Sequence, residues 1–182
     1  MSVPTTRRLA GLFLLVAVAA CSRQRDPDPA SRGEIDDHAP IRATASVVID
    51  ATPSDVWGVL ADVRSWPAWQ HDIRATTIGR APAVGVKFRW SISGGTIRSR
   101  FTVFDPAHRL AWSGSLFVFH AVHVWILRTQ PDGETRVETR ESLSGWPIGW
   151  LYSSADLLEA NRRWLAALKI EVEARHMAPT RG

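Results

Sequence analysis

One histidine and one glutamate have the residue types and the placement for acid–base chemistry. His123 and Glu141 lie in two segments whose alternating pattern predicts strands, and the alternation puts each of them on an apolar face. A lone carboxylate on such a face is costly unless it is paired or protonated, and an imidazole is a suitable partner. One interpretation is a ligand-orienting or acid–base pair at the floor of a cavity. The other is a buried polar pair that only fixes the register of the two strands.

Tryptophan is unusually frequent, with nine residues in 182. A tryptophan side chain combines a large apolar area with one N–H donor, which suits a packed core and the wall of a cavity equally well. Both interpretations can hold at once. The residues that we expect to contact a ligand are Trp66, Trp69, Phe88, Trp90, Phe101, Trp112, His123, Trp125, Glu141, Trp146 and Asn161.

Two of these candidates have specific alternatives. Asn161 interrupts an apolar helical stripe, so its amide either points at a ligand or bonds a nearby backbone carbonyl. Trp146 lies in the Gly- and Trp-rich segment 145–150, which is either a flexible apolar lip over a pocket mouth or a packed start of the last helix.

Several kinds of site are not expected. His120 and His123 point to opposite faces of one strand, and Cys21 is the single cysteine, so we expect no metal site. Gly-rich phosphate loops and serine-nucleophile motifs are absent from the sequence, and we expect no cofactor. The formal net charge is +4, and about +2 remains without Arg7 and Arg8. The other basic residues are interleaved with acids, which argues against nucleic-acid binding.

The elements that position these residues follow from periodicity. Residues 41–49 predict a strand, Thr52 and Pro53 the start of a helix, and residues 65–69 a very short second helix. Residues 71–143 predict about six strands, with hairpin turns at residues 94–95 and 132–133. Residues 147–175 predict one long helix. Its apolar stripe consists of Leu151, Ala155, Leu158, Leu165, Leu168 and Val172.

The order of these elements, together with residues 51–69, 109–114 and 121–125, resembles the SRPBCC (START/polyketide cyclase-like) superfamily over residues 42–176. The resemblance implies an α+β helix-grip fold. In it, an antiparallel curved sheet of about seven strands wraps around a long C-terminal helix, and two short helices follow the first strand. We assign residues 41–176 to this ligand-binding domain and residues 177–182 to a disordered tail.

The first 40 residues predict export and attachment. Arg7 and Arg8 precede an apolar run, residues 9–20, that is shorter than the roughly 20 residues of a membrane span. Residues 18–21 resemble the lipobox of bacterial lipoproteins, which implies a signal peptide over residues 1–20 and lipidation of Cys21. The alternatives are an ordinary signal peptide with a chance cysteine and an uncleaved anchor. Residues 21–40 predict a flexible tether.

Three functions remain open, and all place the protein at an extracytoplasmic membrane surface of the cell envelope. We favour a monomeric binding or carrier protein for a small hydrophobic molecule such as a lipid, an isoprenoid or an aromatic polyketide-like compound. The second is a cyclase or dehydratase-like enzyme in which His123 and Glu141 move a proton. The third is an envelope module that binds another protein. With one candidate pair and no second catalytic group, we expect binding rather than catalysis.

Overall fold

Seven antiparallel strands form a single sheet in the computed structural model, which describes residues 29–177. The strand order is β1-β7-β6-β5-β4-β3-β2, so the first strand closes the meander against the last. The strands are β1 (Ile41–Ile49), β2 (Ala75–Ile78), β3 (Lys87–Ile92), β4 (Gly95–Asp105), β5 (Arg109–Leu116), β6 (Phe119–Thr129) and β7 (Thr135–Ser144). This architecture confirms the predicted α+β helix-grip fold. The predicted hairpin turn at residues 132–133 is present, and the one predicted at 94–95 lies one residue earlier, at Ser93 and Gly94.

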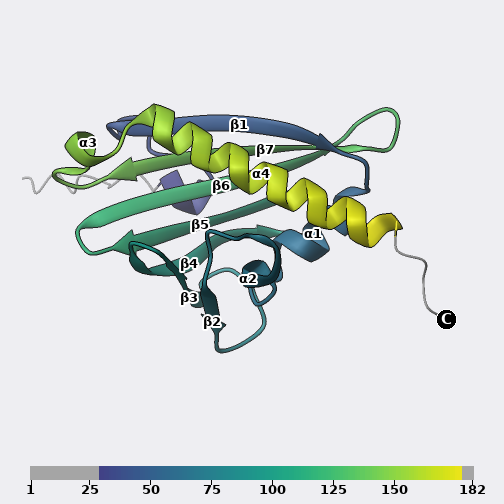
Figure 1. Cartoon of the computed structure of the whole chain (residues 1–182), viewed down its shortest axis with the longest axis horizontal. Helices are drawn as coiled ribbons and strands as arrows, with labels where there is room; N and C mark the ends of the chain where they lie inside the picture. Colours follow the sequence, from purple (N-terminus) through teal and green to yellow (C-terminus); the bar gives the residue numbers. More distant parts are fainter. Residues whose placement is uncertain (1–28, 178–182) are drawn as a thin grey trace, which may run out of the picture.

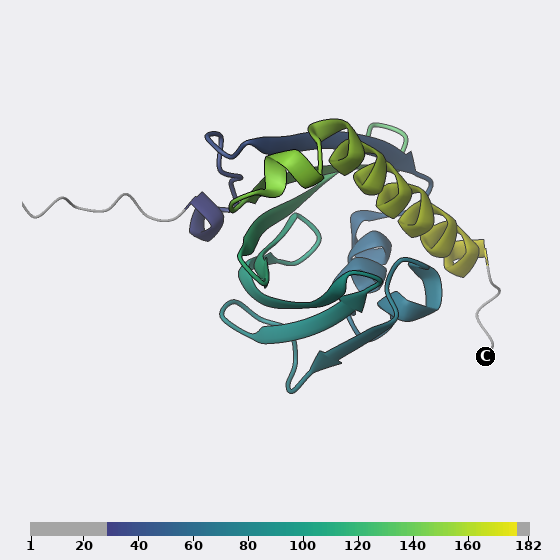
Figure 2. The ribbon, with the colours of Figure 1, turned by 60° about the vertical axis from the view of Figure 1, so that its left-hand side comes forward.

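One long helix covers the concave face of this sheet (Figure 1). Figure 2 shows that the sheet curls into an open arc, with the long helix and the two short helices after β1 along its open side. The helices are η1 (Pro29–Arg32, 3-10), α1 (Pro53–Leu60), α2 (Trp66–Trp69), α3 (Ile148–Leu151) and α4 (Ser154–Met177). The predicted start of α1 is confirmed, because Thr52 and Asp55 form a capping box.

The single C-terminal helix predicted over residues 147–175 is wrong in one respect, because two helices occupy this segment. The chain leaves helical geometry at Tyr152, and Ser153 then caps α4. The Ser153 hydroxyl accepts a hydrogen bond from the backbone N–H of Asp156, and the Asp156 carboxylate accepts one from the backbone N–H of Ser153. Leu151 and Ala155, which were predicted for the buried stripe, are exposed, and Trp164, which was not, is buried.

The N-terminal segment differs from the expected tether where the structure describes it. Residues 29–40 lie against the outer face of the sheet, where Ala30 and Ala39 are buried. Ile35 packs against the outer-face cluster of Ala111, Val124 and Ile126. The signal peptide, Cys21 and residues 178–182 of the predicted tail lie outside the described residues. Among residues 29–177, no helix is long and apolar enough to span a bilayer.

Candidate functional site

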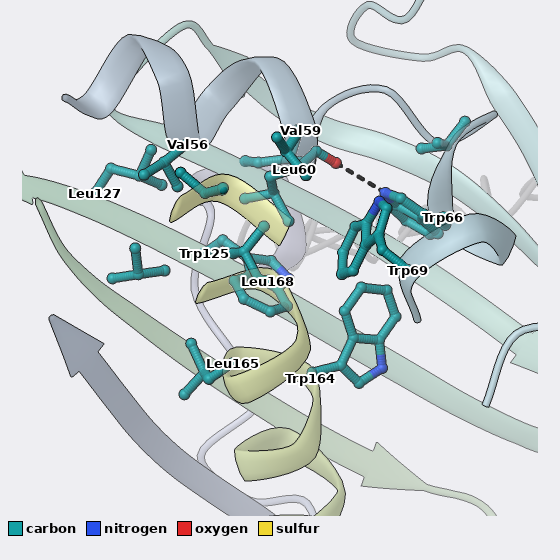
Figure 3. Packing of buried hydrophobic residues seen from close by; sticks show 14 of the residues in the cluster. Val56, Val59, Leu60, Trp66, Trp69, Trp125, Leu127, Trp164, Leu165 and Leu168 are labelled. Atoms are coloured by element: carbon teal, nitrogen blue, oxygen red, sulfur yellow. Dashed lines mark hydrogen bonds between the residues drawn. The ribbon is translucent and has the colours of Figure 1, made fainter. Parts of the chain in front are cut away.

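Aromatic rings fill the space between the sheet and α4 (Figure 3). Trp66 on α2 is fully buried, donates a hydrogen bond from Nε1 to the Leu60 carbonyl oxygen (3.0 Å), and contacts Trp112 and Trp164 with centroid distances of 5.4 and 5.1 Å. Edge-to-face and tilted pairs at these distances add to the hydrophobic stabilisation. The predicted binding residues that belong to this cluster are Trp66, Trp69, Phe88, Trp90, Phe101, Trp112 and Trp125. They form a packed core, as one of the two interpretations predicts, and their contact with a ligand stays a prediction.

His123 lies at the edge of this aromatic cluster, facing α4. Its ring stacks on Trp125 with a centroid distance of 5.0 Å and lies 4.8 Å from that of Trp112. His123 Nε2 and Thr139 Oγ1 share a hydrogen bond of 2.6 Å. Burial lowers the pKa of the His123 imidazole to about 3, so the ring is neutral at physiological pH.

Glu141 lies directly across from His123 in the register of β6 and β7, on the inner face that its alternation predicted. The distance from Glu141 Oε1 to His123 Nδ1 is 3.7 Å, which is too long for a hydrogen bond. Burial raises the pKa of the Glu141 carboxyl to about 8, so this side chain is predominantly protonated at pH 7. The two residues are neighbours, as predicted, but they are neutral rather than an ion pair, and Thr139 is the closer partner of His123.

Asn161 brings an amide from α4 to this polar cluster. Its side chain faces the Glu141 carboxyl and lowers the pKa of that group, which opposes the larger effect of burial. The two side chains nevertheless lack hydrogen-bond geometry. Asn161 is only 1% exposed, and within residues 29–177 neither its amide nitrogen nor its amide oxygen has a hydrogen-bond partner. The backbone hydrogen bond that we considered for this residue is therefore absent from the described residues.

The polar cluster thus combines Asn161, His123, Thr139 and Glu141 from three elements. Fourteen per cent of the Glu141 side chain reaches solvent, against 3% for His123, so the carboxyl is the more accessible of the two titratable groups. Tyr152, between α3 and α4, adds a half-buried phenol whose pKa is raised by burial and then by the Glu141 charge. Thr139 and Tyr152 were not among the predicted site residues. The inward alternation of Thr139 with Glu141 was the signal that could have identified it.

The remaining predicted binding residue, Trp146, lies away from this cluster. It is 79% exposed and contacts Trp150 of α3 with a ring-centroid distance of 6.4 Å. In the described part of the chain, no group of three or more His, Cys, Asp or Glu side chains is placed to hold a metal ion.

Comparison with protein families shows which family the sequence matches. Residues 40–173 match the family described as polyketide cyclase / dehydrase and lipid transport. The chain belongs to this family. The match covers the whole sheet and most of α4, including the four residues of the polar cluster.

Several solved structures share the architecture. A hypothetical protein from Helicobacter pylori, jhp0584, has a TM-score of 0.66 at 19% identity, over 74% of this chain and 89% of that one. The Zhui aromatase/cyclase from Streptomyces sp. R1128 has a TM-score of 0.63 at 19% identity, over 76% and 97%. TTHA0849 from Thermus thermophilus has a TM-score of 0.62 at 16% identity, over 74% and 98%. No curated protein matches the sequence. At these identities the likeness establishes the fold alone.

Proposed function

We propose that the domain binds a small hydrophobic molecule and holds its polar group between Glu141 and Asn161. The unpartnered amide of Asn161, buried beside a carboxyl, is the observation that carries this proposal. Buried polar groups are almost always hydrogen-bonded, because leaving one unpaired costs about 1–3 kcal/mol. A ligand hydroxyl or carbonyl that paired with the amide would recover this energy on binding. The protonated Glu141 carboxyl adds a second donor, and the surrounding tryptophans add apolar area.

Exchanging the amide for an apolar group of similar size separates binding from stability. Asn161→Leu removes two unpaired polar atoms, so it should leave the protein as stable as wild type or more stable. The same change should lower the amount of copurified hydrophobic ligand at least tenfold, a difference of about 1.4 kcal/mol. Native mass spectrometry with solvent extraction of the purified protein measures the ligand, and urea unfolding measures the stability.

Arg162→Leu, on the exposed face of the same helix, is the matched control and should retain the ligand. Wild-type protein that carries no extractable ligand, and binds none from a panel of fatty acids, isoprenoids, quinones and aromatic polyketides, would contradict the proposal. So would an Asn161→Leu protein that retains ligand like the wild type.

A cyclase or dehydratase-like reaction in the same site is the second candidate. The divergent pKa values of Glu141 and His123 favour it, because a carboxylic acid that stays protonated near pH 7 can act as a general acid. A ligand recovered in chemically altered form after incubation, with Glu141→Gln blocking the alteration but not the binding, would favour catalysis. An unaltered ligand in both proteins favours a carrier.

We further propose that the chain is a lipoprotein attached to a cell-envelope membrane through Cys21. The sole cysteine follows an apolar run and small residues, as lipidation requires. Several acyl chains on one residue would attach it stably, since each buried CH₂ contributes about 0.8 kcal/mol. Cys21→Ala should release the protein from membranes or leave it unprocessed, as seen by fractionation and intact mass. A variant that is processed and sediments like the wild type would disprove lipidation.

A further inference from the structure

Large apolar side chains gather at one end of the molecule. Five of the eight large apolar side chains that residues 29–177 expose lie there, each between 59% and 85% exposed. They come from the β5–β6 turn and from the segment that joins β7 to α4: Phe117, Val118, Trp146, Trp150 and Leu151. We call this set the apolar tip. Figure 1 shows the β5–β6 turn and α3 at the same end.

Close contacts between the loops make the apolar tip one continuous surface. A side-chain carbon added at Gly145 would collide with the Val118 carbonyl oxygen and lie 3.0 Å from Phe119 Cα, so the loop before α3 rests on the β5–β6 turn. The Phe117 ring lies in turn against Gly95 at the β3–β4 turn. Three neighbouring loops therefore contact one another and carry the exposed side chains on one surface.

Positive charge continues from the apolar tip onto the outer face of the sheet. Arg98 pairs in register with Ser115, two residues before Phe117, and also faces Arg89 on β3. Lys87 faces Arg100 in the same two strands. Like charges that face each other across strands are destabilising, and within residues 29–177 none of these four side chains forms an ion pair.

A second pair of facing arginines has contacts that offset the repulsion between them. Arg128 and Arg136 face each other across β6 and β7 near the opposite end of the sheet. Arg128 lies 3.7 Å from Glu138, and Arg136 donates a hydrogen bond to the Ser46 hydroxyl. The cations on β3 and β4 line instead an open groove of about 590 Å³, together with Ser113 and Ser115. The sequence-based expectation that basic residues are interleaved with acids is wrong here, since no acid occurs between Ile73 and Asp105.

We infer that this end of the protein docks onto a lipid bilayer with anionic headgroups. The apolar tip would insert its indole, phenyl and leucyl groups at the interface, where tryptophan is favoured, and the cations of β3 and β4 would contact lipid phosphates. β1 also begins at this end of the sheet. The inference goes beyond the proposed ligand binding and does not depend on it.

Quenching of tryptophan fluorescence by brominated acyl chains tests the docking in the full-length protein. Residues 1–28 contain no tryptophan, so all emission comes from the domain. With vesicles of phosphatidylcholine and phosphatidylglycerol, the wild type should lose roughly a fifth of its emission, the share of two indoles among nine. Trp146→Ala combined with Trp150→Ala should abolish this loss. Trp57→Phe, on α1 away from the apolar tip, is the control and should retain it.

A second pair of variants tests whether docking requires the positive charges on β3 and β4. Arg89→Gln combined with Arg98→Gln should lose at least about half of the quenching, because each basic residue near an anionic surface contributes about 1 kcal/mol, roughly a fivefold change. Arg128→Gln combined with Arg136→Gln should quench like the wild type. Equal quenching with and without phosphatidylglycerol would overturn the anionic-lipid assignment. Absence of quenching in both vesicle types would overturn bilayer docking and leave a protein as the occupant, whatever the ligand assays show.

Discussion

Replacing Trp66 with alanine is expected to lower the free energy of unfolding by about 3–5 kcal/mol. The side chain is fully buried, and its ring lies within 6.1 Å, centroid to centroid, of four other aromatic rings. The truncation would leave a cavity among rings that are fixed from several elements, so collapse around it is limited. It would also remove the donor that satisfies the buried Leu60 carbonyl oxygen. Urea unfolding followed by circular dichroism measures the effect.

Trp150→Ala is the matched control for this experiment. The same truncation at a side chain that is 85% exposed should change the free energy of unfolding by less than about 0.5 kcal/mol. Similar losses for the two variants would show that the aromatic cluster is not the main source of stability. The comparison also distinguishes buried tryptophans from exposed ones, which the sequence alone shows only as a high tryptophan content.

The sequence predicted the sheet because its signals are local. Alternation, turn residues and the Thr52 cap each act within a few residues, and β1 was predicted at its observed bounds. The break at Tyr152 was missed because the apolar stripe continues across it. The capping box of Ser153 and Asp156 starts a new helix at this point. Its signal in the sequence is a serine three residues before an acid. Residues 29–40 were predicted as a tether from composition, which cannot register the packing of Ala30 and Ile35 against the sheet.

For the candidate site, the sequence predicted which face of the sheet each side chain points to. Period-two alternation placed Glu141 inward and opposite His123, as observed. It could not give the 3.7 Å separation or the competing hydrogen bond of His123 to Thr139, which depend on side-chain rotamers. It also could not show that burial outweighs the attraction between the two charges. The clustering of cations on β3 and β4 could have been found in the sequence, because Arg89 and Arg98 are nine residues apart in one hairpin and no acid occurs between Ile73 and Asp105.

A protonated Glu141 beside an unpartnered Asn161 gives the site a consistent chemical character. One O–H donor, two N–H donors and two carbonyl acceptors are then available to a neutral ligand group, and no net charge has to be buried when the ligand binds. An anionic carboxylate at the same place would repel a ligand carbonyl and would be costly in this aromatic environment. The protonation state of Glu141 is therefore the property on which binding and stability both depend.

The pH dependence of stability should reveal that protonation state. The pKa of Glu141 is about 8 in the folded protein and near 4.5 when unfolded, so the folded state binds the extra proton and stability falls as pH rises toward 8. The pKa of His123 is about 3 when folded and near 6.5 when unfolded, so its contribution has the opposite sign and rises between pH 3 and 6.5. The two contributions largely cancel between pH 4.5 and 6.5. Above this range the Glu141 contribution dominates.

Wild-type protein should therefore lose about 1.5 kcal/mol of unfolding free energy between pH 6.5 and about pH 9, and Glu141→Gln should lose less than half of that. Glutamine resembles the protonated acid in shape and remains uncharged, so the variant keeps the fold while removing the titration. Glu138→Gln, on the outer face of the same strand, is the matched control for the pH profile. It removes ion pairs with Arg128 and Arg140, but it should lose as much unfolding free energy over this pH range as the wild type. Urea unfolding of the three proteins across this range measures the difference. Identical pH profiles for wild type and Glu141→Gln would mean that Glu141 is already ionised at pH 7, and a neutral carboxyl donor in the site would have to be abandoned.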